Sequence, residues 1–512
     1  MRLLIVSVAL QTLLTKSTYL GSMPKLASVQ MRSWLCVVAV FLLSTILYGC
    51  ASLASRGLLP EVKARRPPEV DLGAELILLN EPVRFSTSLI STDGRAHVFV
   101  TNAKRQLQHI EIVGDKILTR EFLGVFETAR YPSLDAVEHP PGRLRVLVGD
   151  RQYVRTAPER DWQEVKGNRC TRFVPIGNDL FCAFVVKGEE VGAPKRTDVT
   201  VGLFILVPVV FWSDKQASKL VMAKESEDGW IICAVLDPET PRDADRDFVV
   251  GTDSLGTLHF LYGASRGGGV FVVAAAGYAD ASGFLDPPLE LRYAQMGLDR
   301  LLALPMDPRN QGLIPGTDPR QWVPIQGTSV PQMPSSYTGK ILWGDLRPFD
   351  RHFAVNKVSG EVSGLMRVDQ GRLDDGTRKL TFKDLDNAWV EVGIQDRRWT
   401  RRFDVIAAKN LPDSTHSWLN DGAAMIKSDP RGNIHALLQD GKMGFWKSNF
   451  SMGYLLKNGS NWSAPLILGN RRNGSDSRTL AMDDSGGAFA TWVNKEGSFV
   501  GRWIRPRGRS LP

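Results

Sequence analysis

The residues Asn461 to Trp492 read NWSAPLILGNRRNGSDSRTLAMDDSGGAFATW. A tryptophan opens the apolar run Pro465 to Leu468, a polar loop follows, and two more strand-like runs flank an Asp-rich turn closed by glycine. Glycine supplies the positive φ that such a turn requires, and Asp side chains bond the turn's own backbone. The stretch therefore predicts a β-meander of about the length of one propeller blade.

Similar turns recur elsewhere, and each precedes a strand-like run: Thr92 to Gly94, Asp135 to Gly142, Asp253 to Gly256, and Asp429 to Gly432. Trp230 and Trp462 precede such turns at nearly the same distance, while Trp162 and Trp399 are a shortened and a stretched version. A period of about 20–50 residues with one supersecondary unit per repeat is typical of solenoids and propellers.

We therefore expect an all-β fold, a single β-propeller over residues 73–506. At roughly 50–70 residues per blade, this length predicts six to eight blades, with seven as the central value. Ala74 to Leu79 is expected to complete the blade formed by the last strands, because closure removes exposed strand edges. Residues 507–512 are expected to be a tail, and residues 284–350, rich in Pro and Gly, a degenerate blade with long loops.

The N-terminus has the pattern of an exported lipoprotein. Trp34 to Tyr48 is an apolar run, short for a membrane span and suited to a signal peptide. Leu47-Tyr48-Gly49-Cys50 resembles the lipobox of bacterial lipoproteins, although Tyr48 departs from the small residue usual there. We expect residues 1–49 to be a signal peptide, with translation starting at Met23 or Met31, and 50–72 to be a Pro-rich tether lipidated at Cys50. The residue after Cys50 is Ala51, not Asp, and in that family this implies the outer membrane of a Gram-negative cell envelope.

Charge gives no reason to expect a nucleic-acid partner. The net charge is +8, and half of it comes from Arg2, Lys16, Lys25 and Arg32 in the first 49 residues. Nucleic-acid binding calls for a basic face with aromatic residues among it. The chain also has no HExxH, paired CxxC, P-loop or dinucleotide fingerprint, so we expect no metal and no cofactor.

Three of the seven histidines occupy one repeat position, three residues after a turn glycine: His97, His259 and His435. One interpretation places them in a ring that lines a channel and binds a ligand. The other lets each histidine pack or hydrogen-bond within its own blade. Repetition favours the second interpretation, because packing is needed in every blade and an active site only once.

The Asp turns resemble degenerate copies of the turn found in sialidase-type propellers, where such turns are structural. That family's catalysis uses arginines, a tyrosine with a glutamate partner and an aspartate, and no local motif here identifies those residues. The phrase Asp429 to His435 also resembles a repeat of sialidase-like propellers that include polysaccharide lyases. This resemblance implies general acid–base work by a histidine on a uronic acid.

Two further features remain. Gly263 to Gly267 matches the nucleophile elbow of serine esterases around Ser265, but a glycine and β-branched run follows where the elbow needs a helix. Cys170, Cys182 and Cys233 leave the disulfide pairing open. If residues 177–179 are the tip of a hairpin, Cys182 lies opposite residue 174, and Cys170–Cys182 is not the obvious pair. Val201 to Trp212 is expected to be a buried strand.

These observations favour a membrane-anchored propeller lipoprotein that binds a glycan or an envelope protein without catalysis. The alternative is a carbohydrate-active enzyme, a sialidase-like hydrolase or a polysaccharide lyase-like protein. A serine esterase is the third hypothesis. Fold alone does not decide among them.

Overall fold

The chain divides into two compact units, Met1–Glu61 and Val62–Pro512. The computed structural model describes residues 66–507 of the second unit except 82, 127–133, 157–160, 166–168, 205–206, 227–228, 266–269, 275–280, 286–289, 303–322, 326–327, 330–337, 342–352, 375–378, 382–387, 396–397, 401–404, 408–423, 444–447, 460 and 472–476. The signal segment, Cys50 and most of the expected tether lie outside the described residues. In the described part, no helix is long and apolar enough to cross a membrane.

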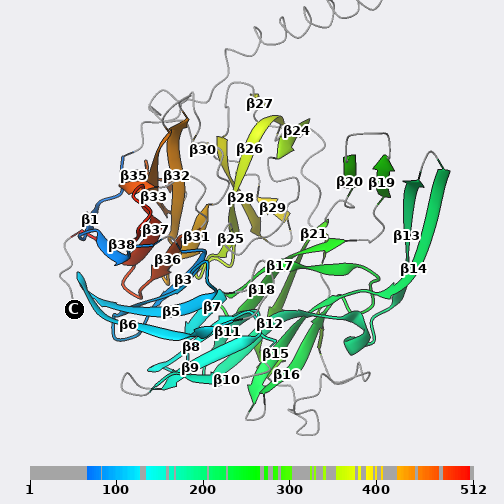
Figure 1. Cartoon of the computed structure of the whole chain (residues 1–512), viewed down its shortest axis with the longest axis horizontal. Helices are drawn as coiled ribbons and strands as arrows, with labels where there is room; N and C mark the ends of the chain where they lie inside the picture. The colour runs from blue at the N-terminus through cyan, green and yellow to red at the C-terminus, as the bar shows by residue number, and fades with distance from the viewer. Residues whose placement is uncertain are drawn as a thin grey trace, which may run out of the picture. The chain divides into compact units, whose positions relative to one another are not determined.

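The second unit is a β-propeller of seven blades with almost no helix (Figure 1). The predicted all-β propeller, with seven blades as its central value, is confirmed. Blades 1 and 2 are sheets of consecutive antiparallel strands. In blade 3, two further strands lie in the connection between β12 and β15, and the sheet also contains the parallel strand β22. Blade 1 is β3 (Phe85–Ile90), β4 (Ala96–Thr101), β5 (Gln106–Val113) and β6 (Lys116–Val125); blade 2 is β7 (Leu134–Glu138), β8 (Arg143–Val148), β9 (Arg151–Thr156) and β10 (Gln163–Val165); blade 3 is β11 (Arg172–Ile176), β12 (Asp179–Val186), β15 (Lys219–Ser226), β16 (Gly229–Leu236) and β22 (Val323–Ile325).

Blades 4 to 6 are less regular. Blade 4 contains β17 (Asp243–Thr252), β18 (Thr257–Ser265), β21 (Glu290–Gly297) and β23 (Thr328–Ser329), with the short helix α3 (Leu298–Leu302). Blade 5 contains β24 (Thr338–Ile341), β25 (Phe353–Val355), β26 (Val362–Asp374), β27 (Lys379–Thr381), β28 (Ala388–Gln395), β29 (Arg398–Thr400) and β30 (Val405–Ala407). Blade 6 contains β31 (Met425–Ser428), β32 (Ile434–Met443), β33 (Ser448–Asn458), β34 (Asn461–Trp462) and β35 (Leu466–Arg471).

Blade 7 joins both ends of the described chain. It contains β36 (Thr479–Met482), β37 (Ala488–Val493) and β38 (Phe499–Pro506), and β38 pairs on its other edge with β1 (Val70–Leu72) and β2 (Leu76–Leu79). The prediction that the first strand completes the last blade is confirmed. Pairing starts at Val70, three residues before the boundary expected for the propeller.

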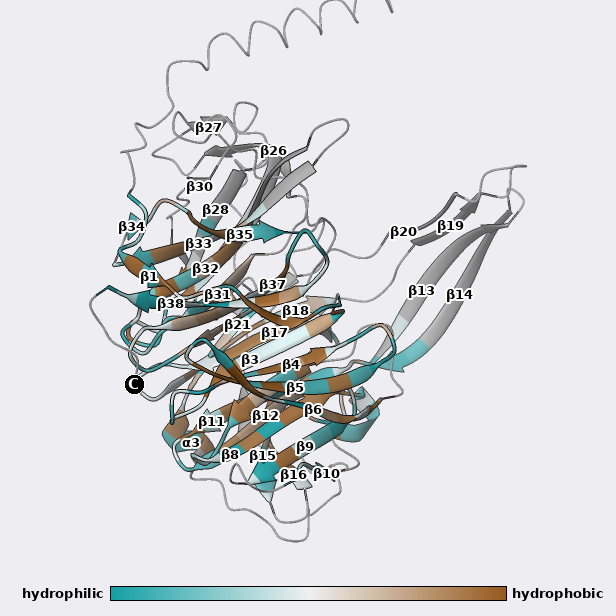
Figure 2. Ribbon diagram, turned by 60° about the vertical axis from the view of Figure 1, so that its left-hand side comes forward, coloured by the Kyte–Doolittle hydropathy of each residue, from teal (hydrophilic) through white to brown (hydrophobic). Residues whose placement is uncertain are grey.

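The innermost strands of the blades form a closed ring. Each strand lies against the next, in the order β3, β7, β11, β17, β25, β31, β36 and back to β3. The second strands are sandwiched between neighbouring blades, so both of their faces are buried. In β4, Val98 and Val100 pack toward Phe489 of blade 7, while Phe99 packs toward Val146 of blade 2. Such strands therefore read as continuous apolar runs (Figure 2).

Two paired hairpins project from the propeller. β13 (Lys195–Phe204) pairs with β14 (Val207–Gln216), and β19 (Val270–Ala274) pairs with β20 (Ala281–Leu285); β13 lies beside β19 (Figure 1). The 3-10 turn η2 (Gly188–Val191) precedes the first hairpin. The prediction of one buried strand over Val201 to Trp212 is wrong, because the run crosses the turn of this hairpin and Leu203 pairs with Pro208.

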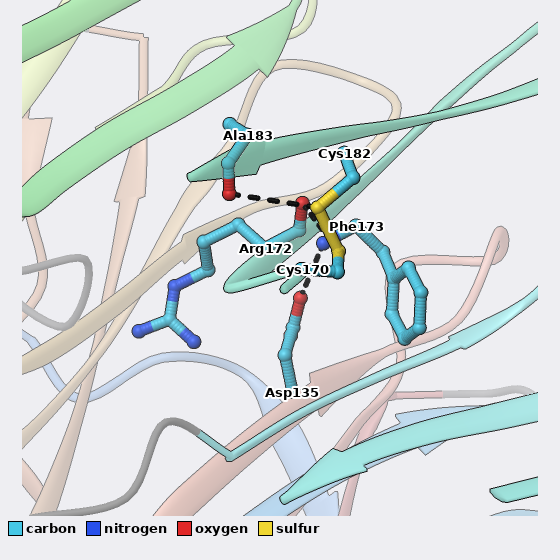
Figure 3. The surroundings of a disulfide bond; sticks show 6 residues. All are labelled: Asp135, Cys170, Arg172, Phe173, Cys182 and Ala183. Carbon is cyan, nitrogen blue, oxygen red and sulfur yellow. Dashed lines mark hydrogen bonds between the residues drawn. A yellow bond between two sulfur atoms is a disulfide. The ribbon is translucent and has the colours of Figure 1, made fainter. Parts of the chain in front are cut away.

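The disulfide joins Cys170 to Cys182, the pair that the sequence disfavoured (Figure 3). The hairpin register places Phe173, not residue 174, opposite Cys182. Cys170 precedes the first strand of the hairpin and folds back toward the second, with a Cα–Cα distance of 5.6 Å to Cys182. The third cysteine, Cys233, is a buried free thiol, and burial raises its pKa to about 12.

The repeated tryptophans differ in their burial. Trp462 is 3 % exposed and packs between blades 5 and 6, against Leu365 and Leu438 among others. Its indole nitrogen donates to Glu391, which also pairs with Lys457. Trp230 is half-buried beside Phe173. Trp462 is therefore a buried packing residue between two blades, whereas Trp230 is only partly covered.

Candidate functional site

The two ends of the blades differ in the length of their connections. At one end, here called the turn face, the first and second strands of every blade meet in a tight turn with a glycine at positive φ: Gly94, Gly142, Gly177, Gly256, Gly360, Gly432 and Gly486. The opposite end, here called the loop face, carries the connections between second and third strands and from blade to blade. Both projecting hairpins arise there. Binding and catalytic residues concentrate on loops held by a rigid scaffold, so a functional site is expected at the loop face.

The three repeated histidines lie on the turn-face side of their strands, in three separate blades. His259 is held between Asp253 Oδ2 (3.0 Å) and the Tyr293 hydroxyl (2.7 Å). His435 is held in the same way between Asp429 Oδ2 (3.4 Å) and the Tyr454 hydroxyl (2.7 Å). Each histidine is buried and uses both ring nitrogens within its own blade. The structure does not bring the three side chains together, and a ligand-binding role for them stays a prediction.

The Asp–His–Tyr arrangement also organises the turn that precedes it. In blade 4, Asp253 Oδ1 accepts hydrogen bonds from the amides of Leu255 and Thr257, while Oδ2 faces His259. Burial alone would raise the pKa of this carboxyl, but the hydrogen bonds from His259 and from the backbone outweigh it and lower the pKa. The charged carboxylate is therefore a structural part of the turn.

A glycine of the next blade closes over this arrangement. A Cβ on Gly360, in the turn of blade 5, would lie 2.7 Å from Asp253 Oδ2 and 3.1 Å from the His259 ring. Gly486 of blade 7 approaches Asp429 of blade 6 in the same way. Neighbouring turns are thus in close contact around the turn face, where no room is left for a ligand at these carboxylates.

Blade 1 replaces the aspartate and the tyrosine by a longer polar chain. His97 Nδ1 lies 3.0 Å from His109 Nε2, and His97 Nε2 lies 3.1 Å from Ser91 Oγ. His109 Nδ1 lies 2.8 Å from Glu121, which also accepts from the indole of Trp162. Burial lowers the pKa of both histidines, that of His97 to about 2. The hydrogen bond from His109 lowers the pKa of Glu121 to about 2.

A buried carboxylate, Glu111, lies beside this pair of histidines. Its oxygens accept from Arg95 at 2.5 Å and from Arg155 of blade 2 at 3.2 Å. Among the described residues, His97, His109 and Glu111 form the one group of three potential metal ligands, with ligand atoms within 4.8 Å of one another. The sequence pointed to His97 alone, since no repeat position marks His109 or Glu111.

At the loop face, a buried ionic cluster lies where the two projecting hairpins begin. Asp237 follows β16, Tyr262 lies near the end of β18, and Arg292 lies near the start of β21. The Tyr262 hydroxyl donates to Asp237 at 2.5 Å, and the Arg292 guanidinium contacts the same carboxylate at 2.6 and 3.2 Å. All three side chains are at most 7 % exposed. Burial, and next the Asp237 charge, raise the pKa of Tyr262 well above its ordinary value.

The backbone that follows β16 is held by hydrogen bonds from the Lys219 ammonium. Lys219, the first residue of β15, donates to the carbonyl oxygens of Asp237, Thr240 and Arg242. Asp237 has φ of +48°, a left-handed conformation that non-glycine residues rarely adopt and that recurs at functional sites. No sequence motif marked Asp237, Tyr262 or Arg292, because they come from three separate strands or connections of two blades.

Two other candidate sites are Ser265 and a surface hollow. Ser265 is the last residue of β18, and the next described element is the strand β19, not the helix that a nucleophile elbow needs. A hollow lined by Ile77, Leu78, Leu79, Asn80 and Arg120 lies at the outer strands of blades 7 and 1.

The fold and this geometry define a seven-bladed β-propeller with two buried polar clusters. No family model and no curated relative matches the chain. Among solved structures it is similar to an ulvan lyase bound to a GlcA(1-4)Rha3S saccharide (9 % identity, TM-score 0.41, covering 86 % of this chain and 98 % of that chain). It is also similar to an α-L-arabinanase from Penicillium chrysogenum (8 %, 0.33, 86 % and 100 %) and an intramolecular trans-sialidase from Ruminococcus gnavus (8 %, 0.33, 86 % and 98 %). Likenesses this distant say nothing about the chemistry of this chain.

Substituting Gly360→Ala should destabilise the protein more than Gly256→Ala. Both glycines have positive φ, 70° and 78°, which costs an alanine about 1–2 kcal/mol. Only at Gly360 would the new Cβ also collide with Asp253 and His259, since nothing lies within 4 Å of a Cβ on Gly256. Denaturant unfolding of both variants measures the difference, and equal losses would show that the close approach contributes nothing.

Proposed function

We propose that the protein is a carbohydrate-active propeller that binds an acidic glycan at the loop face and acts on it. The observation that carries this proposal is the cluster of Asp237, Tyr262 and Arg292 at the foot of the two hairpins. A phenol and a guanidinium each lie 2.5–3.2 Å from one carboxylate, at a strained backbone position and on the face with long connections. Strain and buried charge of this kind recur where a protein carries out chemistry.

Each of the three side chains has a role that follows from its chemistry. Tyr262 carries a hydroxyl proton, so it acts as a proton donor to a leaving oxygen. Arg292 pairs with a sugar carboxylate, because its planar guanidinium can donate two parallel hydrogen bonds to the two carboxylate oxygens. Asp237 holds the Tyr262 hydroxyl and the Arg292 guanidinium in position. A uronic acid or a sialic acid is therefore the expected sugar.

Access to the cluster requires a movement at the loop face. The three side chains are buried, and the connection from Asp237 to Arg242 is held by the Lys219 ammonium. A glycan reaches Arg292 when this connection moves aside and the sugar carboxylate takes over one of the bonds from Asp237. Exchange of one carboxylate for another keeps the guanidinium paired throughout.

Tyr262→Phe should reduce turnover of uronic-acid polymers or sialosides by about 10²–10⁴-fold, the usual contribution of a positioned proton donor. Tyr454→Phe is the matched control, because it also removes a buried hydroxyl but at the turn face of blade 6. Release of unsaturated uronate and of reducing ends is measured on the full chain. Equal activity of the two variants contradicts the assignment of Tyr262, and binding without any turnover contradicts the enzymatic proposal in favour of a glycan-binding scaffold.

We further propose that a lipid on Cys50 anchors the propeller in the cell envelope, at the outer membrane of a Gram-negative bacterium. The support is the sequence Leu47-Tyr48-Gly49-Cys50 after an apolar run, followed by the prolines Pro60, Pro67 and Pro68. The anchor keeps the propeller close to envelope glycans.

Cys50→Ser should abolish acylation and leave an uncleaved precursor, since the lipidated residue is the cysteine itself. Metabolic labelling with an alkynyl fatty acid, followed by detection of the labelled protein, measures this. Equal label on the wild type and on the variant contradicts lipidation at Cys50.

A further inference from the structure

The polar chain inside blade 1 lacks one positive charge. It runs from Asp93 through Ser91, His97 and His109 to Glu121, so a carboxylate stands at each end. Asp93 is an ion-pair partner of the Arg95 guanidinium at 2.8 Å, and Glu121 of the Arg155 guanidinium at 3.3 Å. Both ends therefore only accept hydrogen bonds.

Counting protons along the chain locates the deficit. The Ser91 hydroxyl lies 2.5 Å from Asp93 Oδ1 and 3.1 Å from the Arg95 carbonyl, both acceptors, so its single proton points to them. Ser91 Oγ then accepts from His97 Nε2, which leaves His97 Nδ1 as a lone pair. His109 donates from Nδ1 to Glu121, which leaves its Nε2 as a lone pair too. These two lone pairs face each other at 3.0 Å.

Two nitrogen lone pairs that face each other at this distance repel, and only a cation between them removes the repulsion. A proton bridges only the two nitrogens. A metal ion also has a third ligand at hand. Each oxygen of Glu111 accepts one arginine N–H and keeps a second lone pair, and its ligand atom lies within 4.8 Å of the histidine nitrogens.

We propose that His97 Nδ1, His109 Nε2 and Glu111 bind a divalent transition-metal ion, zinc by the chemistry of the ligands, inside blade 1. Two imidazoles and one carboxylate suit zinc, whereas magnesium and calcium prefer oxygen ligands. The outer nitrogens are already held as a metal site requires, His109 by a carboxylate and His97 by a hydroxyl. This site is independent of the proposed function at the loop face.

The site explains why blade 1 departs from the pattern of blades 4 and 6. There the second-strand histidine meets a tyrosine hydroxyl, which donates or accepts as needed and closes the chain without a cation. In blade 1 the equivalent partner is His109, whose proton is committed to Glu121. Trp162 and Arg155 of blade 2 donate hydrogen bonds to Glu121, the partner of His109. The metal would therefore connect blade 1 to blade 2 through His109 and Glu121.

The test is the zinc content of the full chain after dialysis against zinc and then zinc-free buffer. About one zinc per chain is expected for the wild type and for the control His435→Gln, which changes the equivalent histidine of blade 6. His97→Gln and His109→Gln should lose the metal. Glu121→Gln, which replaces the carboxylate partner of His109 by a neutral amide, should weaken zinc binding by about 10–100-fold.

A second readout does not depend on the folding of the variants. Cobalt added to the wild-type chain should give a visible absorption band that zinc abolishes and magnesium leaves unchanged. No retained zinc and no cobalt band in the wild type would overturn the proposal and show that Ser91 turns its proton to His97 instead. Equal zinc in wild type, His97→Gln and His109→Gln would overturn it as well.

Discussion

The hydrogen bonds between β38 and the N-terminal strands β1 and β2 are the constraint on which the rest of the propeller depends. They bring two segments 420 or more residues apart into one blade, and the Arg502 side chain adds a bond to the Gly73 carbonyl, 429 positions away. Blade 7 in turn covers the β3–β4 face of blade 1 through Phe489, Phe499 and Trp503. Without this closure, the outer edge of β38 would be exposed, and Leu78 of β2 would be lost from the core between blades 7 and 1.

Within the closed ring, polar contacts at the turn face set the position of each blade against the next. A turn carboxylate binds its own backbone and a second-strand histidine, and a glycine of the following turn packs onto that pair. Blade 1 uses the same position differently, with a histidine pair and two carboxylates that meet arginines from the turn and from blade 2. The loop face is free of this repeated constraint, and it carries the long hairpins and the Asp237–Tyr262–Arg292 cluster. The division between a face that holds the ring together and a face that varies is what the functional proposal rests on.

The sequence predicted the repeated parts well and the singular parts poorly. Turns with glycine and aspartate, the closing strand and the number of blades follow from local signals that recur along the chain. The turn of blade 5 was not recognised, because it uses Asn356 and Gly360 in place of Asp and Gly at the usual spacing. The Cys170–Cys182 pairing depends on a hairpin register that differs by one residue from the expected one. Neither polar cluster was predictable, because Glu111, His109, Asp237 and Arg292 meet their partners only through tertiary packing.

Closure of the ring is measured most directly by hydrogen exchange of backbone amides, followed by mass spectrometry on the full chain across increasing denaturant. If β1 and β2 close blade 7, peptides from these strands and from β38 should exchange at the same low rate as the second strands β4 and β37, and all should lose protection together at the global transition. Rapid exchange of β1 and β2 while β4 and β37 remain protected would contradict the account, because it would show that the ring holds without its N-terminal strands.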